Sequence, residues 1–209
     1  MARNKIVGWM VAGAAIAVLA MAATPVLAQK TSGFYIGGGA GQSNMLDLSH
    51  LCYDQLATAG VNVTSCDSKG TTWKAFGGYQ FIRYFGVELG YYDFGKGTIK
   101  SSNAGQADFK ARGPFAGIVV TAPMTDRLSF LARAGAIRWS TKFNPDATSG
   151  LTGVSDNGIN GWFGLGFEYM FTDSFGTRFE FERFATIGND ASTGQTNINV
   201  WTVSGLLRF

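Results

Sequence analysis

The fold is decided by the stretch Trp73-Lys74-Ala75-Phe76-Gly77-Gly78-Tyr79-Gln80-Phe81. Its odd-numbered positions are aromatic or small, whereas its even-numbered positions mix a charge, a ring, a glycine and an amide. Successive side chains point to opposite faces of a β-strand, so a period of two indicates a strand. We therefore predict a strand here, with one apolar face and one mixed face.

The same alternation recurs through the chain after residue 30, where no helical period persists. Phe179 and Phe181, for example, face away from Arg178 and Glu180. Together with a glycine-rich opening segment, the alternation predicts eight strands, at 33–43, 71–82, 85–94, 106–122, 127–140, 159–171, 175–187 and 197–209.

The connections between these predicted strands are short and long in turn. Tight turns are expected at 83–84, 123–126 and 172–174. Longer loops, rich in Ser, Thr, Asn, Asp and Gly, are expected near 44–70, 95–105, 141–158 and 188–196. An up-and-down transmembrane barrel has this form, because its periplasmic turns are short and its outer loops are long.

The two faces of the strands distinguish a membrane barrel from a soluble one. A soluble β-sandwich or barrel turns its apolar faces inward. The chain is 46% hydrophobic and only 15% charged, and its mixed face has too many charges for a dry core and too few for a wetted surface. We expect the mixed face to line the inside and the apolar face to meet lipid. The predicted fold class is all-β, an eight-stranded antiparallel up-and-down transmembrane β-barrel.

Aromatic residues near the predicted strand ends suit the interfacial girdles of such a barrel. The expected girdle residues are Trp73, Phe81, Tyr84, Phe85, Tyr91, Phe94, Trp139, Trp162, Phe171 and Phe175. After the N-terminal segment, no stretch approaches the roughly 20 apolar residues of a spanning helix.

Residues 1–28 are predicted to be a secretory signal peptide that precedes a mature chain at 29–209. Arg3 and Lys5 give a positive start, an uncharged apolar stretch follows, and the segment ends in a small-residue cleavage pattern. The apolar stretch approaches the lower limit for a spanning helix, so a retained membrane anchor is the alternative. Pro25 and the cleavage pattern favour removal and export.

Cys52 and Cys66 are the only cysteines of the chain. In an exported protein, an even pair within a polar stretch predicts one local disulfide. Closing a loop of this size stabilises the fold by roughly 3 kcal/mol in the chain-entropy model. Two free thiols are the alternative, while a zinc site lacks a second pair of nearby ligands.

Several of these stretches are similar to the OmpA-like outer-membrane barrels of Gram-negative bacteria. The similarity spans nearly the whole mature chain, and the order and spacing of its motifs are more specific than any one of them. The motifs are Gly33-Phe-Tyr-Ile-Gly-Gly-Gly-Ala-Gly, the stretch from Trp73 to Phe81, Gly86-Val-Glu-Leu-Gly-Tyr-Tyr, Pro123-Met-Thr-Asp-Arg-Leu, Arg133-Ala-Gly, Gly166-Phe-Glu-Tyr, Gly176-Thr-Arg-Phe-Glu-Phe and the terminal Phe209.

The resemblance implies a location in the outer membrane and a set of partners. A terminal aromatic residue, here Phe209, is part of the signal that the barrel-insertion machinery reads in this family. Periplasmic chaperones, outer-membrane lipid and lipopolysaccharide are the other expected partners, and the barrel is expected to be a monomer. Larger members add a peptidoglycan-binding domain, but the resemblance covers the barrel alone, so cell-wall tethering is not expected.

Acidic and basic residues fall on the predicted inward faces. The set is Glu88, Arg133, Glu168, Arg178 and Glu180. The resemblance implies that Glu88, Glu168 and Arg178 pair across a narrow lumen, and an eight-stranded barrel is just wide enough to be filled by its side chains. Because unpaired buried charges cost several kcal/mol each, we predict a structural ion network that plugs the lumen. A gate that opens by rearranging these pairs is the alternative.

The sequence gives little support to catalysis, metal binding or nucleic-acid binding. The only histidine, His50, lies near Asp47, Ser49 and Asp54 in a predicted loop, which indicates a solvated loop more than a triad. We predict no catalytic residues, no cofactor and no metal site. Without Arg3 and Lys5, the 17 basic residues become 15, against 14 acidic residues, and no Lys/Arg stripe indicates nucleic-acid binding.

Three functions remain open from the sequence. The leading prediction is a surface-exposed structural protein that supports envelope integrity and contacts host or environmental ligands through its loops. A small or gated pore for ions and small solutes is the alternative. A lipid-modifying hydrolase that uses His50 is the third hypothesis.

Overall fold

The computed structural model describes residues 32–47, 63–102, 105–145, 153–189 and 194–209. Among these residues, no helix is long and apolar enough to cross a membrane. The strands are β1 (Gly33–Met45), β2 (Val63–Asp67), β3 (Lys69–Ile82), β4 (Phe85–Ser101), β5 (Gly105–Pro123), β6 (Leu128–Pro145), β7 (Val154–Met170), β8 (Phe175–Asn189) and β9 (Gly194–Arg208).

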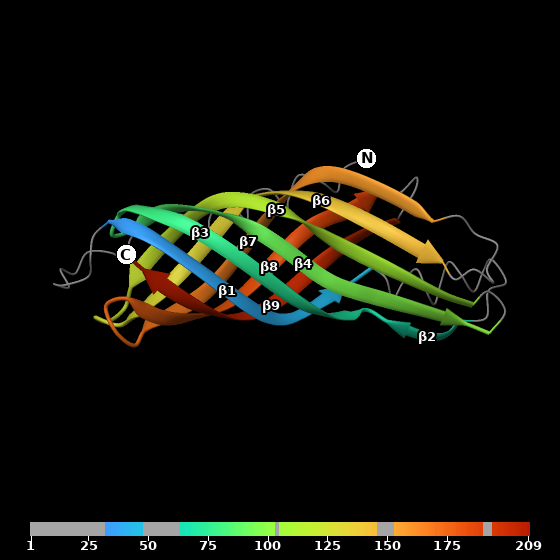
Figure 1. Cartoon of the computed structure of the whole chain (residues 1–209), viewed down its shortest axis with the longest axis horizontal. Coiled ribbons are helices and arrows are strands. Elements are labelled where there is room, and N and C mark those ends of the chain that lie inside the picture. The colour runs from blue at the N-terminus through green and yellow to red at the C-terminus, as the bar shows by residue number, and fades with distance from the viewer. Residues whose placement is uncertain (1–31, 48–62, 103–104, 146–152, 190–193) are drawn as a thin grey trace, which may run out of the picture.

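Eight of the strands close into an antiparallel barrel, shown in Figure 1. Each of the strands from β3 to β8 pairs with the next one along the chain, and β1 pairs with both β3 and β9. The remaining strand, β2, precedes β3 in the chain and pairs with the C-terminal end of β4. The structure therefore confirms the predicted fold class.

Closure is complete along the seam between the first and last strands. The register runs from Tyr35 opposite Arg208 to Met45 opposite Ile198. Phe209 adds a hydrogen bond beyond the strand, because its N–H donates to the carbonyl oxygen of Phe34 at 2.9 Å. Pairing the first strand with the last leaves neither of them with a row of unpaired N–H and C=O groups. A bilayer requires this of strands that cross it, because unpaired backbone groups are costly in hydrocarbon.

Alternation along each strand turns the barrel inside out relative to a soluble protein. In β7, Trp162, Glu168 and Met170 are buried, whereas Phe163 and Leu165 are about half exposed, at 53% and 49%. The outward apolar residues of all eight strands form a band around the wall, and the inward face carries the charges. This is the arrangement that a lipid-embedded barrel needs.

Two of the tight turns at the rim near the C-terminus are built alike (Figure 1). In the first, the Thr125 hydroxyl oxygen accepts the N–H of Leu128 at 3.0 Å. In the second, the Thr172 hydroxyl oxygen accepts the N–H of Phe175 at 3.0 Å. A threonine that bonds to the backbone within the turn fixes a short connection without glycine.

The strands extend further toward the loops than the alternation predicted. β4, for example, runs to residue 101 instead of 94 and passes through a bulge at Gly95. Gly95 has a φ of +76°, and a Cβ there would lie 2.3 Å from the Thr71 carbonyl oxygen, so only glycine fits. The sequence prediction ended the strand here because the polar, glycine-rich segment has the composition of a loop. In the structure it remains paired wall.

The expected aromatic girdles are only partly correct. Trp73, Phe81, Phe85, Phe171 and Phe175 lie on the outside, between 38% and 50% exposed. The remaining assignments differ, because Phe94, Trp139 and Trp162 point into the barrel and are at most 4% exposed, while Tyr84 and Tyr91 are intermediate. Proximity to a strand end was a poor guide, since the parity of the position decides the face.

A charge on the lipid-facing wall is expected to destabilise the barrel in a depth-dependent way. Leu165→Arg places a cation within the apolar band and should lower the free energy of unfolding by about 2–4 kcal/mol. Asn157→Arg, on the same outward face of β7 but nearer the loops, should cost less than about 1 kcal/mol. Urea unfolding of both variants in phospholipid vesicles measures the difference. Equal losses at the two sites would contradict the placement of the band.

Candidate functional site

The lumen holds an ion network of four basic and four acidic side chains. Seven of these side chains are at most 1% exposed, and that of Arg208, near the turn rim, is 13% exposed. The members, called the lumen ion network, are Lys74, Arg133, Arg178, Arg208, Glu88, Glu168, Glu180 and Glu182. Equal numbers of opposite charges satisfy the requirement that buried ions be paired.

The centre of the network consists of two cations that share two carboxylates. Arg133 Nη1 lies 2.7 Å from Glu180 Oε1 and 2.7 Å from Glu182 Oε1. Lys74 Nζ lies 2.5 Å from Glu180 Oε2 and 2.9 Å from Glu182 Oε2. The phenol of Tyr92 also donates to Glu182. Each carboxylate of this pair therefore has both oxygens engaged.

A second set of contacts leads from the centre toward the turn rim. Glu88 accepts from both Arg133 and Arg178, and the Tyr35 hydroxyl donates to Glu88 Oε1 at 2.8 Å. Arg178 Nε lies 2.7 Å from Glu168 Oε2, and Arg208 Nη2 lies 2.5 Å from Glu168 Oε1. Glu88 and Glu168 thus link the arginines into one continuous chain of ion pairs.

Aromatic rings hold the guanidinium groups from the sides. The Arg178 guanidinium lies 5.0 Å from the ring centre of Tyr35 and 5.1 Å from that of Phe76, and the Arg133 guanidinium lies 5.0 Å from that of Trp162. Cations over ring faces gain further electrostatic stabilisation, and more where water is excluded. The rings therefore restrict the arginines to the positions in which they meet the carboxylates.

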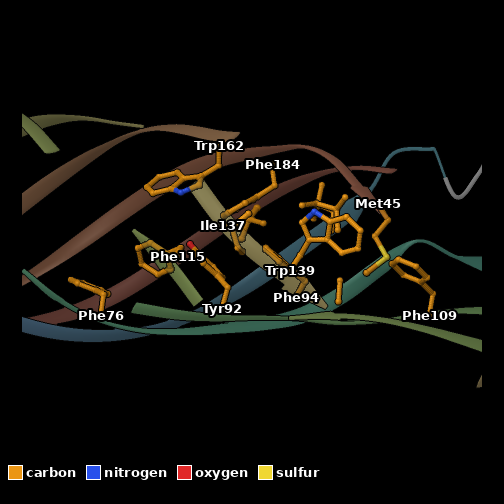
Figure 2. Close-up of a cluster of buried hydrophobic side chains, with 14 of the residues drawn as sticks. Met45, Phe76, Tyr92, Phe94, Phe109, Phe115, Ile137, Trp139, Trp162 and Phe184 are labelled. Atoms are coloured by element: carbon orange, nitrogen blue, oxygen red, sulfur yellow. The ribbon is translucent and has the colours of Figure 1, made fainter. Parts of the chain in front are cut away.

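The lumen on the loop side of the ion network is filled by an apolar cluster, shown in Figure 2. The ring centres of Tyr92 and Phe94 are 5.2 Å apart, those of Phe94 and Phe184 are 4.7 Å apart, and those of Phe115 and Trp162 are 5.5 Å apart. These five rings are at most 3% exposed. The packing continues toward the loops. We call the five rings, together with Ile137, Trp139, Met45, Phe109, Ile187 and Ile198, the lumen apolar cluster.

Glycine makes room for two of the rings nearer the turn rim. Gly37 is the register partner of Phe76, and Gly78 is that of Tyr35. A Cβ at Gly37 would lie 2.4 Å from Phe76 Cζ, and one at Gly78 would lie 2.4 Å from Tyr35 Cζ. Large residues opposite glycine let a narrow barrel close around its own side chains.

Family membership follows from comparison with known proteins. The sequence matches the OmpA-like transmembrane domain over residues 29–209. The chain belongs to the OmpA-like family. This OmpA-like chain lies in the outer membrane, as the resemblance implied.

The sequence relatives support this assignment, and the solved structures share the barrel fold. Outer membrane protein A of Serratia marcescens is 29% identical over 182 residues, which cover 86% of this chain and 50% of that protein. The OmpA-like chain thus spans about half the length of the relatives it matches. Neisserial surface protein A covers 86% of this chain with all of its own, at a TM-score of 0.59 and 14% identity. OprG of Pseudomonas aeruginosa covers 87% with 98% of its own, at 0.54 and 14% identity.

All five residues predicted for the interior lie in the lumen of this OmpA-like barrel, and the structure joins them in one network. The prediction omitted Lys74, Glu182 and Arg208, although their positions have the same inward parity. It also omitted the phenols of Tyr35 and Tyr92, because their carboxylate partners, Glu88 and Glu182, lie on strands that only the closed sheet brings within reach.

The remaining predicted sites lie mostly outside the described residues. Cys66 is in β2 and is disulfide-bonded, but Cys52 is outside the described residues, so their pairing stays a prediction. His50 is also outside them. Phe209 directly follows β9 and is 61% exposed, and its role in assembly stays a prediction. Within the described ranges, no group of three or more His, Cys, Asp or Glu side chains is arranged to hold a metal ion.

Removing one shared cation should expose the dependence of the barrel on its ion pairs. Arg133→Ala leaves Glu88, Glu180 and Glu182 with too few partners and should lower the free energy of unfolding by about 3–5 kcal/mol. Arg138→Ala, on the exposed face of the same strand, should change it by less than about 0.5 kcal/mol. The measurement is urea unfolding in detergent micelles. A second change, Glu182→Gln, should recover part of the loss, and strict additivity of the two would contradict a shared network.

Proposed function

We propose that this chain is a structural protein of the outer membrane, with a lumen closed by its own side chains. The single observation that carries the proposal is the continuous burial along the lumen axis. The lumen ion network fills the half nearer the turns, and the lumen apolar cluster fills the half nearer the loops. A solute would have to displace both.

The energetics favour a closed lumen over an open one. Separating a buried ion pair leaves an uncompensated charge at a cost of several kcal/mol. Arg133 contacts three carboxylates at once, so a path past it requires several pairs to separate together. The rings of Phe94 and Phe184 are fully buried and lie beyond this barrier, and apolar rings offer no partner to a passing ion.

The proposal also includes ligand binding by the loops on the outer side of the barrel. The predicted loop ligand, from a host or the environment, concerns segments that lie largely outside the described residues. We keep loop binding as part of the proposal, and loss of binding on trimming 44–70 would support it. The longer relatives carry sequence beyond the matched region, so their activities are not transferred to this chain.

Conductance separates the structural barrel from a pore. The refolded wild-type protein should give no single-channel steps above background in a planar lipid bilayer. A Phe94→Ala/Phe184→Ala variant, which removes two rings from the lumen apolar cluster, should still give none, because the lumen ion network stays closed. Arg178→Ala tests that network in the same assay.

One result of this experiment would favour the pore alternative, and a second would change which side chains close the lumen. Reproducible steps in the wild-type protein whose size changes in Arg178→Ala would assign conduction to the lumen. Steps that appear only in the ring variant would show that the lumen apolar cluster alone closes the barrel. A folding control by heat-dependent gel migration keeps misfolded protein out of the comparison.

Deletion of the gene should sensitise the envelope to detergent with chelator. The expected phenotype is reduced growth in sodium dodecyl sulfate with EDTA, restored by the wild-type protein. His50→Ala should restore growth as fully as the wild type, because the proposed role needs no catalytic histidine. Failure of His50→Ala to complement, together with altered lipid A products, would replace the structural proposal with the hydrolase hypothesis.

A further inference from the structure

Five basic side chains gather on the outer wall, on the neighbouring strands β4, β5 and β6. All five are exposed, and we call them the basic cluster: Lys96, Lys110, Arg112, Arg138 and Lys142. Lys110 is the register partner of Lys96 on one side and of Lys142 on the other. Three lysines therefore form a row across three strands, and the two arginines lie on the same outward face nearer the apolar band.

The sheet gains nothing from this arrangement, because like charges directly opposite each other destabilise a strand pair. Three acidic residues lie close by. Asp67, exposed on β2, is the register partner of Thr98 in β4. Lys96 Nζ is 3.5 Å from Asp108 Oδ2, and Asp93 is the register partner of Arg112. In the part of the chain that the structure describes, Lys110 and Arg112 form no ion pair, nor do Arg138 and Lys142. The five cations, with exposed Lys69 and Lys100 beside them, thus face three carboxylates, which leaves an excess of positive charge.

The basic cluster lies at the outer boundary of the membrane band. Along β5, Arg112 is 11 positions from Pro123 at the turn rim (123 − 112). A strand advances about 3.3 Å per residue, and at a tilt of about 40° this amounts to roughly 28 Å of height. The apolar band of such barrels is about 25 Å tall. Below the cluster, the outward side chains of Leu89 and Ile118 are apolar and exposed.

The opposite wall lacks this charge at a comparable distance from the turns. The outward positions of β1 and β9 there are Asn44, Asn197 and Asn199, which are uncharged. Two basic residues border these positions. Lys69, the register partner of Asn44, is exposed on β3 at the side of the basic cluster, and Arg183, the register partner of Asn199, is partly buried. The positive charge is therefore concentrated on one side of the barrel.

The structure assigns to the basic cluster a binding site for the phosphorylated headgroup of lipopolysaccharide in the outer leaflet. Lysine and arginine form charge-assisted hydrogen bonds with phosphate oxygens, and these bonds are stronger than neutral ones. The acyl chains of the same lipid would lie along the apolar wall beneath, over Leu89, Ala116 and Ile118. The inference rests on the location in the outer membrane and is independent of whether the lumen is closed.

The position of the cluster favours a lipid over a soluble polyanion. Cations directly above an apolar wall match an amphipathic ligand, with its anionic group at the interface and its chains in the bilayer. A soluble polyanion would need only the charges. We therefore commit to the lipid and treat the polyanion as an outcome of the test.

The test measures binding of lipid A to the full folded chain in phosphatidylcholine nanodiscs. Lipid A should bind the wild-type protein at least about tenfold more tightly than dephosphorylated lipid A, since three or more charge-assisted contacts are lost. Lys110→Ser/Arg112→Ser/Lys142→Ser should lose the same factor. Lys110→Arg/Arg112→Lys/Lys142→Arg, which keeps the charges, should stay within about threefold of the wild type.

A matched control removes three charges elsewhere, as Arg83→Ser/Arg127→Ser/Arg183→Ser, and should leave lipid A binding within about twofold. Equal weakening in this control, or none in the cluster variant, would overturn the site. Dextran sulfate that binds as tightly as lipid A and displaces it would overturn the choice of a lipid. Single-serine variants of each cluster residue provide the comparison if the triple variant does not fold.

Discussion

In the hydrocarbon core of a bilayer, every backbone N–H and C=O must find its partner within the protein, because an unpaired group costs several kcal/mol there. The pairing of β1 with β9 meets this requirement, since it closes the sheet between its first and last strands. Closure then divides every strand into a lipid side and a lumen side. The inverted distribution of Leu165 outside and Glu168 inside is a consequence of that division.

A closed barrel of eight strands is narrow, so whatever points inward must pack or pair. The chain uses two solutions in sequence along the axis. Near the turns, carboxylates and guanidinium groups neutralise one another, and near the loops, rings and aliphatic side chains exclude water. Arg133 lies where the two regions meet, because its guanidinium contacts carboxylates and also lies over the ring of Trp162. Neither region leaves a buried charge without a partner among the members of the network.

The outer wall is under different constraints, because it contacts lipid along the apolar band and water beyond it. The strands remain paired beyond the apolar band, and their outward residues become polar there. Positive charge gathers on β4, β5 and β6 against the preference of the sheet for unlike neighbours. An anionic ligand at the membrane boundary best explains why these like charges lie side by side despite their repulsion. The lumen and the wall thus carry separate roles on one set of strands.

The sequence by itself determined the eight strands of the antiparallel barrel and the inward face of Glu88, Arg133, Glu168, Arg178 and Glu180, because a period of two is local information. It missed β2, which lies within the predicted loop 44–70. It did not determine neighbours across the lumen. Lys74 meets Glu180 across 106 positions of sequence, and only the closed sheet brings them together. The same limit applies to the row of Lys96, Lys110 and Lys142. These residues are far apart in the sequence, and only strand pairing brings them together. Periodicity tells which face a residue occupies, while register and closure, which depend on the whole sheet, decide what lies beside it.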